Sequence, residues 1–451
     1  MAFIHPRILT FRQMPCSGSI SLPLTIRFST HLCSFLQPPF DLSCLSDAAI
    51  TKRLKENALA RECPVDFDRL LELHKRHLAG EQETRAELMS LINQLPNRTH
   101  PLTPIGDASK AKLIHLHGAK PVADWKLKNI VALCSDSAPC TTMCSTSDGR
   151  PTLCPAFHLR CRGVSAGAGP RTYYFGGCLA QLERALVSYT LRRLSTIGFT
   201  LISVPDILPE HVVEACGFST RGDRSQVYKL CSEQPSSQHC LSGTSEMALA
   251  GFCADRTLDS GSSSDPDALG LCAVSRCFRQ EAPRQEALLY RVHQFTKVEM
   301  FAVTKPELAV GDAMFDKILN LQISLFADLG LHFKVLEMPT TELGNSAYRK
   351  VDIEAWMPGE SAYGEISSTS NCLDYQSKRL NIRWSTPSGD NPFAYTLNGT
   401  ACAVPRMMKA IIETHQNKDG TIRIPEVLVP ILKQQGALPS SKTEAHFKRA
   451  V

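Results

Sequence analysis

The stretch from Cys277 to Phe301 brings together residue types that could bind a charged, aromatic ligand. It reads CFRQEAPRQEALLYRVHQFTKVEMF, which predicts two strands of alternating residues joined by a polar loop. Arg279 and Glu281 lie two residues apart, so both side chains would leave the same face of the first strand. One face of the second strand would carry His293, Phe295, Lys297 and Glu299. An antiparallel pair would therefore gather cations, carboxylates and an aromatic ring on one side.

This predicted face has the chemistry of a nucleotide site. An arginine suits a phosphate, an aromatic ring suits a base that stacks on it, and a carboxylate can accept from exocyclic amino groups. A surface hairpin laced with salt bridges would explain the same residues equally well. The hairpin alone leaves both interpretations open.

Four further segments of mixed polar and small residues accompany the hairpin. In chain order they are Gly198-Phe199-Thr200 with Val204-Pro205-Asp206, Gly243-Thr244-Ser245-Glu246, Glu365-Ile366-Ser367-Ser368 with Asn371-Cys372-x-Asp374-Tyr375-Gln376-x-Lys378-Arg379, and Asn398-Gly399-Thr400-Ala401 with Ala403-Val404-Pro405-Arg406. Together with the hairpin, they resemble in type and order the signature motifs of class II aminoacyl-tRNA synthetases of the seryl family. The details are most similar to the animal mitochondrial members. Five ordered matches over roughly residues 170 to 430 are specific in combination.

The fold and activity follow from two kinds of reasoning. Short strands framed by helices predict an α+β fold with an antiparallel sheet. The resemblance implies a class II synthetase catalytic domain and an ATP-dependent serine–tRNA ligase. Such an enzyme would form seryl-adenylate and transfer serine to tRNA(Ser) in mitochondrial translation.

The resemblance also implies a role for each site residue. The catalytic residues would be Arg279, Glu281 and Arg406, with Arg279 at the α-phosphate and Arg406 at the γ-phosphate end. The residues that bind ATP would be Arg279, Gln280, Glu281, Val292, Phe295, Glu365, Ile366, Ser367, Ser368 and Arg406. The residues that bind L-serine would be Thr244, Ser245, Glu246, Glu299 and Thr400. Glu365 and Ser368 would hold Mg²⁺, which prefers oxygen ligands.

Three regions are predicted along the 451 residues. Residues 1–30 resemble a mitochondrial transit peptide, because arginines are spread through a segment that has no acidic residue before Asp41. This predicts a location in the mitochondrial matrix, and a basic disordered tail is the alternative. Residues 31–94 would form a truncated helical tRNA-binding arm, and 95–451 the catalytic domain, with a divergent, poorly ordered insert at 127–170.

The predicted arm has room for about one long helix. Its amphipathic part, residues 66–94, would span ~40 Å at the helical rise per residue. A single helix cannot pair with itself, so we expect the arm to be loosely held and easily cleaved by protease. Its deletion would then weaken tRNA binding and leave serine activation unchanged.

Composition limits the remaining possibilities. The net charge of +5 fits an enzyme that meets RNA on one surface patch. The 18 cysteines are scattered through apolar segments, which favours free thiols over a disulfide framework. No Cys-x-x-Cys pair occurs among the cysteines of residues 127–170, which argues against a zinc knuckle there. No apolar run is long enough to span a bilayer, so no membrane partner is expected. The segment Gly198-Phe199-Thr200 with Val204-Pro205-Asp206 resembles the family's first motif, which lies at the dimer interface, so the resemblance implies a homodimer.

Two alternatives stay open. A synthetase-like paralogue without charging activity, acting as an RNA- or partner-binding protein, would explain the short arm. A folding-compromised variant of a working enzyme would retain the motifs and lack activity. The retained Arg279, Glu281, Glu299, Glu365 and Arg406 favour the enzyme. The loop between Glu281 and Arg291 is shorter than the family usually shows, so transfer to tRNA could be altered while adenylation is intact.

Overall fold

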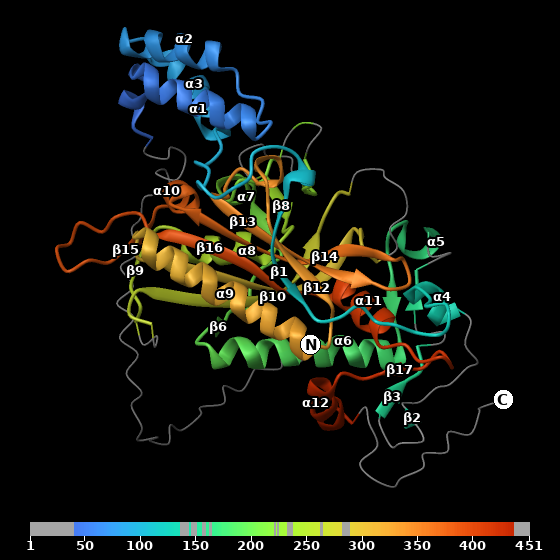
Figure 1. Ribbon diagram of the computed structural model, residues 1–451. Coiled ribbons are helices and arrows are strands. Elements are labelled where there is room, and N and C mark those ends of the chain that lie inside the picture. Colours follow the sequence, from blue (N-terminus) through green and yellow to red (C-terminus); the bar gives the residue numbers. More distant parts are fainter. Residues whose placement is uncertain are drawn as a thin grey trace, which may run out of the picture. The chain divides into compact units, whose positions relative to one another are not determined.

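Figure 1 shows the computed structural model of the protein. The structure describes residues 40–135, 144–145, 151–155, 159–161, 165–220, 222, 225–231, 238–261, 265–281 and 289–436. The predicted transit peptide, residues 1–30, and the loop residues 282–288 lie outside these ranges. No helix within them is both long and apolar enough to cross a membrane.

The N-terminal helical domain consists of three short helices, α1 (Ala48–Ala60), α2 (Phe67–Leu78) and α3 (Arg85–Gln94). The side chains of Asp47 and Asp66 accept backbone N–H groups at the starts of α1 and α2 and so fix where these helices begin. The prediction of one helix over residues 66–94 is wrong, because α2 ends at Leu78 and Gly80 adopts a φ of +96°.

These helices bury their apolar residues against one another. The core of the helical domain contains Leu45, Ala58, Phe67, Leu70, Leu73, Leu88, Met89, Ile92 and Leu95. A bundle with its own core resists local opening better than an isolated helix. The helical domain is therefore expected to resist proteolysis better than the single helix predicted from the sequence.

The larger domain, which follows the helical domain, is built on an eight-stranded sheet in the order β1-β12-β13-β14-β16-β11-β10-β6. Its strands are β1 (Lys112–His117), β6 (Thr200–Leu201), β10 (Ala268–Phe278), β11 (Gln294–Thr304), β12 (Phe333–Glu337), β13 (Arg349–Met357), β14 (Ala362–Leu373) and β16 (Tyr395–Ala403). Neighbouring strands are antiparallel except that β6 runs parallel to β10. The predicted α+β class with an antiparallel sheet is confirmed.

The two faces of the sheet are covered differently. Along β11, Val298, Met300 and Ala302 belong to a core shared with α6 (Gly177–Thr196), α9 (Leu308–Asp328) and α11 (Val404–Thr414). Phe301 and Val303 point to the other face, where they pack with α7 (Glu210–Ala215) and α8 (Ser245–Cys253). The strict alternation of side chains along a strand therefore separates a helix-covered core from a second face.

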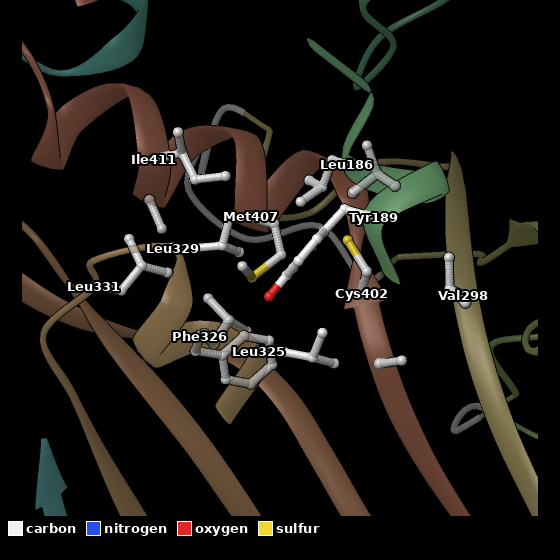
Figure 2. Packing of buried hydrophobic residues seen from close by; sticks show 14 of the residues in the cluster. Leu186, Tyr189, Val298, Leu325, Phe326, Leu329, Leu331, Cys402, Met407 and Ile411 are labelled. Carbon is white, nitrogen blue, oxygen red and sulfur yellow. The ribbon is translucent and has the colours of Figure 1, made fainter. Parts of the chain in front are cut away.

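Figure 2 shows the first of these cores. Side chains of α6, α9 and α11 converge with those of the sheet, and Tyr189, Met407, Leu325 and Cys402 lie close together in its centre. The buried helices form a rigid backing for the central strands, on which a site can be held in fixed geometry.

The remaining elements are short. They are α4 (Ile130–Ser135), α5 (Ser165–Ala168), α10 (Tyr375–Leu380), α12 (Val429–Gln434), β2 (Cys144–Ser145), β3 (Pro151–Leu153), β4 (Leu159–Arg160), β5 (Tyr174–Phe175), β7 (Ile207–Pro209), β8 (His239–Leu241), β9 (Arg256–Leu258), β15 (Ile382–Trp384) and β17 (Ile422–Arg423). Strands β17, β3 and β2 form a separate three-stranded sheet.

Residues 127–170, predicted as a poorly ordered insert, are described only in part, and some of the described residues belong to the main core. Ile130, Leu133 and Leu153 are almost fully buried in the core shared with α6. These residues are therefore integral to the fold. Within the described ranges, no group of three or more His, Cys, Asp or Glu residues is placed to hold a metal, and Cys134 and Cys154 are free thiols.

Candidate active site

A cavity of about 510 Å³ opens on the sheet face that carries α8. Of the predicted site residues, those that line it are Thr244, Glu246, Arg279, Glu281, Val292, Phe295, Glu299, Glu365, Ile366, Ser367, Ser368, Thr400 and Arg406. They come from α8, from the hairpin β10–β11 and from β14, β16 and α11. Segments distant in sequence therefore converge in one place.

Two β-bulges bring side chains three residues apart onto this face. The register of β13 with β14 shifts between Ile353 and Glu354, which leaves Ile366 as an extra residue. Glu365 and Ser368 then both line the cavity. A bulge re-aims the side chains beyond it, because the inserted residue reverses the alternation.

The second bulge is in β16. Thr400 pairs with Glu299 and Cys402 pairs with Val298, so Ala401 is the extra residue. Thr400 and Ala403 consequently both line the cavity. The end of β16 is thereby turned so that α11 begins beside the site.

The hairpin carries the aromatic and cationic wall of the cavity. The Arg279 guanidinium lies 5.3 Å from the centre of the Phe295 ring, and its Nε donates to the Gly243 carbonyl at 3.3 Å. The sequence predicted Arg279 within the first strand. It instead directly follows Phe278, the last residue of β10. Its backbone N–H still donates to the His293 carbonyl at 2.9 Å, so the hairpin pairing continues through it.

A second cationic group lies across the cavity, where α11 begins. Arg406 Nη1 lies 3.2 Å from Oε2 of Glu365 and donates to that residue's carbonyl at 3.1 Å. The guanidinium lies over the Tyr290 ring at 4.4 Å. Burial alone would raise the pKa of Glu365, but the charges of Arg406, Lys350 and Arg279 lower it below its usual range. Glu365 is therefore a carboxylate at neutral pH.

Glu281 also has a cationic neighbour. Arg291 Nη1 lies 3.1 Å from Glu281 Oε2, and the Glu281 side chain is only 6% exposed. His293, from the same predicted face, does not line the cavity, because its Nδ1 hydrogen-bonds the Tyr228 hydroxyl at 2.8 Å and the Arg279 carbonyl at 3.1 Å. The ring of His293 therefore contacts the backbone of Arg279 and does not face the cavity.

The deepest part of the cavity contains two carboxylates and one lysine. Lys297 Nζ lies 2.6 Å from Oε2 of Glu299 and 2.7 Å from the Thr244 hydroxyl, and its side chain is 5% exposed. Thr400 donates its hydroxyl to Glu299 at 3.1 Å. A buried charge is tolerated only when paired and hydrogen-bonded, and this network satisfies that condition.

Glu246 differs from Glu299 because no cation among the described residues forms an ion pair with it. Its Oε1 accepts from Gln376 Nε2 at 2.6 Å and from Asn398 Nδ2 at 2.9 Å. Burial and the nearby charge of Glu299 raise the pKa of Glu246 to about 7, against the opposing effect of Lys297. This carboxyl is therefore poised between its protonated and ionised forms at neutral pH.

Two predicted residues do not line the cavity. Ser245 is fully buried at the start of α8, and its hydroxyl has no hydrogen-bond partner among the described residues. Gln280 donates its backbone N–H to the Gln226 carbonyl at 2.9 Å. Ser245 therefore packs inside the fold, and Gln280 continues the backbone pairing beyond the end of β10.

Sequence reasoning assigned no role to several lining residues, although it had placed Lys297 on the correct face of its strand. Lys297, Asn398, Tyr290 and Lys350 contribute to the wall. Lys297 and Asn398 lie within segments already singled out, and their even spacing from Glu299 and Thr400 was the available signal. Lys350 carries no such signal. It reaches the cavity from β13, where its Nζ lies 2.8 Å from Asp352.

The donor set suits a hard cation. Glu365 supplies one accessible carboxylate, with its side chain 38% exposed, and the Ser368 side chain lines the same cavity. Mg²⁺ is commonly held by one or two carboxylates together with water and substrate phosphates. The residues present therefore fit a magnesium ion that a bound nucleotide would share.

Comparison with known proteins identifies the family. A family model described as the tRNA synthetase class II core domain (G, H, P, S and T) matches residues 228–415. The chain is 37% identical over 357 residues to the serine–tRNA ligase of Treponema denticola, which covers 77% of each protein. The chain belongs to the seryl-tRNA synthetase family. It is also similar to the mitochondrial serine–tRNA ligase of Mus musculus, at 41% identity over 355 residues and 78% of the chain.

The match spans only 64% of the length of that mouse protein and 61% of the corresponding Bos taurus protein. Among solved structures, the fold is similar to the seryl-tRNA synthetase of Pyrococcus horikoshii complexed with ATP, with a TM-score of 0.67 and 29% identity. That alignment covers 89% of this chain and 90% of the other. The predicted membership of the seryl-tRNA synthetase family is confirmed.

Proposed function

We propose that this chain is an ATP-dependent serine–tRNA ligase that forms seryl-adenylate and transfers serine to tRNA(Ser) in the mitochondrial matrix. One observation carries the proposal. A single cavity presents Arg279 and Arg406 to an anion and, deeper, Glu246 and Glu299 to an ammonium. This separation of charge matches the two substrates of amino-acid activation.

Activation joins the serine carboxylate to the α-phosphorus of ATP, and the bond to pyrophosphate breaks. Two anions must meet, and the negative charge on the five-coordinate phosphorus must be stabilised. Positioned cations supply both effects. Arg279 is held in place by the Gly243 carbonyl and by Phe295, so it meets the reacting phosphate without first having to order itself.

The adenine would bind on the hairpin wall. Phe295 offers a ring for stacking, and Glu281 offers a carboxylate to the exocyclic amino group. Arg406, beside Glu365, would receive the γ-phosphate end. Mg²⁺ held by Glu365 and Ser368 would neutralise phosphate charge when bound. Arg406 and Lys350 would keep the Glu365 carboxylate ionised for that task.

Serine would occupy the deep end of the cavity. The Thr400 hydroxyl, the Thr244 hydroxyl and Glu299 form a polar network that can hydrogen-bond the substrate's hydroxyl and ammonium groups. A site built to bond a hydroxyl rejects alanine strongly, because its own buried polar groups would otherwise lose their partner. Threonine would be excluded by lack of room for its methyl group.

The helical domain would contribute to tRNA binding through exposed cations. The candidates are Lys52, Arg53, Lys55, Arg76 and Arg85. Three of them, Lys52, Lys55 and Arg76, form exposed ion pairs with carboxylates, and an RNA phosphate could take the place of each carboxylate. Phosphate contacts of this kind weaken steeply with salt. The exposed apolar residues Leu201, on the edge strand β6, and Ile207, on β7, support a homodimer.

Serine-dependent exchange of pyrophosphate into ATP, with and without tRNA, tests this function. We expect exchange with serine and much less with alanine or threonine, followed by serine transfer to mitochondrial tRNA(Ser). Exchange without transfer would place the defect in tRNA handling. A folded protein that binds RNA but shows no exchange would instead establish the non-charging paralogue.

A further inference from the structure

Arg61, which directly follows α1, is a buried cation at the junction of the helical and catalytic domains. It is 6% exposed, and no ion pair within the described ranges includes it. Nη1 donates to the carbonyls of Asn97 at 2.8 Å and Ala347 at 3.0 Å, and Nη2 donates to the carbonyl of Gly344. Burial without a carboxylate partner lowers the pKa of Arg61 to about 10.

Two of these carbonyls belong to a segment that forms part of the cavity wall. We call residues 342–348 the strap. Glu342, Gly344, Ser346 and Ala347 line the cavity, whereas the carbonyls of Gly344 and Ala347 face Arg61. The strap therefore has the site on one side and the helical domain on the other.

Asn97 provides a second tie at the same place. Its backbone N–H donates to the Asn345 carbonyl at 2.8 Å, and its Nδ2 donates to the carbonyls of Ser346 at 2.9 Å and Cys372 at 2.8 Å. Arg61 also donates to the Asn97 carbonyl. Its guanidinium therefore fixes the position of Asn97 relative to the strap carbonyls of Gly344 and Ala347. A planar guanidinium imposes this geometry more strictly than a flexible ammonium would.

The strap is connected to the deep end of the cavity. Tyr348, the last residue of the strap, donates its backbone N–H at 2.7 Å to the carbonyl of Asn371, which directly precedes Cys372. Asn398 Nδ2 lies 3.6 Å from Cys372 Sγ and donates to Glu246 Oε1 at 2.9 Å. Polar contacts thus join Arg61 to Glu246 by way of the strap, the neighbouring residues Asn371 and Cys372, and Asn398.

We propose that Arg61 is a positioning residue for the amino-acid end of the site, acting through the strap on Glu246. The inference deepens the proposed function, because it assigns Arg61 to serine binding and not to ATP binding or tRNA binding alone. The helical domain is then a structural component of the activation site. Its removal would perturb serine activation, contrary to the expectation from the sequence.

The test compares three full-length variants in pyrophosphate exchange without tRNA. Arg61→Met removes the guanidinium and keeps an unbranched side chain about as long as the aliphatic part of arginine, and Arg61→Lys keeps the charge without the planar fork. Arg69→Met is the matched control. Arg69 belongs to the same domain, but it pairs with Glu72 and Glu87 on the exposed surface and does not contact the strap.

We expect Arg61→Met to raise the KM for serine about tenfold while the KM for ATP changes less than twofold, since misplacement of a binding group costs affinity for its own ligand. Arg61→Lys should fall between Arg61→Met and the wild type, and Arg69→Met should match the wild type. Equal changes in both KM values, or the same change in Arg69→Met, would overturn the proposal.

Amide hydrogen exchange in a peptide spanning residues 340–350 tests the strap without relying on catalysis. Faster exchange in folded Arg61→Met than in Arg69→Met is expected, because the strap carbonyls lose their anchor. Unchanged exchange would refute the role of Arg61 even if serine activation were absent. Absence of serine-dependent exchange in the wild type would instead refute the proposed function.

Discussion

Arg279 is held from two directions, by the Gly243 carbonyl and by the Phe295 ring. We predict that Arg279→Ala lowers serine-dependent pyrophosphate exchange by at least about 100-fold, because loss of one preorganised charge donor costs about 3 kcal/mol at the transition state. Arg276→Ala, three residues earlier on an exposed position of β10, is the control and should retain exchange. Comparable activity of the two variants would remove Arg279 from the phosphate site.

Glu246 gives the second prediction at the scale of a residue. Its pKa is raised to about 7, so the folded protein favours the protonated form relative to an unfolded chain. This group's contribution to stability is therefore greatest at low pH and is lost as pH rises from the unfolded pKa of about 4.3 through 7. The ammonium of serine favours the ionised form, and so do Lys297 and Arg279.

The KM for serine should therefore fall as pH rises from 6 to 7.5 and then level off, whereas the KM for ATP should change little. Steady-state exchange kinetics over this range provide the measurement. In Glu246→Gln the serine KM should be higher and nearly independent of pH. A wild-type serine KM that is flat across pH 7 would show that Glu246 does not titrate during binding.

At the scale of the element, β16 and α9 approach each other closely at Gly399. A Cβ there would lie 2.6 Å from Ile318 Cγ2 and 3.1 Å from Gln322 Nε2. Gly399→Ala should reduce the free energy of unfolding by about 1–3 kcal/mol, the usual cost of overpacking a core. Denaturant unfolding measures this, and Gly167→Ala, where a Cβ meets no atom within 4 Å, should change stability much less.

The elements also show what the sequence could and could not predict. Alternation correctly placed Phe295, Lys297 and Glu299 on one face of β11, because β11 pairs with β10 without a bulge. The bulge at Ile366 left no sequence signal, since register is decided by the partner strand. Residues 66–94 were predicted as one helix because apolar residues recur at helical spacing in both α2 and α3. The chain turns at Gly80 between the two helices, which then pack on each other. The ties of Arg61 to the strap were unpredictable because they join positions 283 and 286 residues apart.

At the scale of the whole molecule, we predict a homodimer. Leu201, on the edge strand β6, is 54% exposed and Ile207, on β7, is 52% exposed, and exposed apolar residues favour association. Light scattering at micromolar concentration should give twice the mass of the chain. Leu201→Glu should shift the protein toward the monomer. A wild-type protein that is monomeric under these conditions would contradict the prediction.

The long separation between Arg61 and its strap carbonyls has a consequence for biosynthesis. At about 5–20 residues per second, roughly 15–60 s pass between the synthesis of Arg61 and that of the strap. The helical domain has its own core and can fold within that interval, with its guanidinium still facing water. Closure of the strap over Arg61 would then be among the last events of folding. A nascent chain stalled before residue 340 would carry a folded N-terminal domain and an incomplete wall for serine.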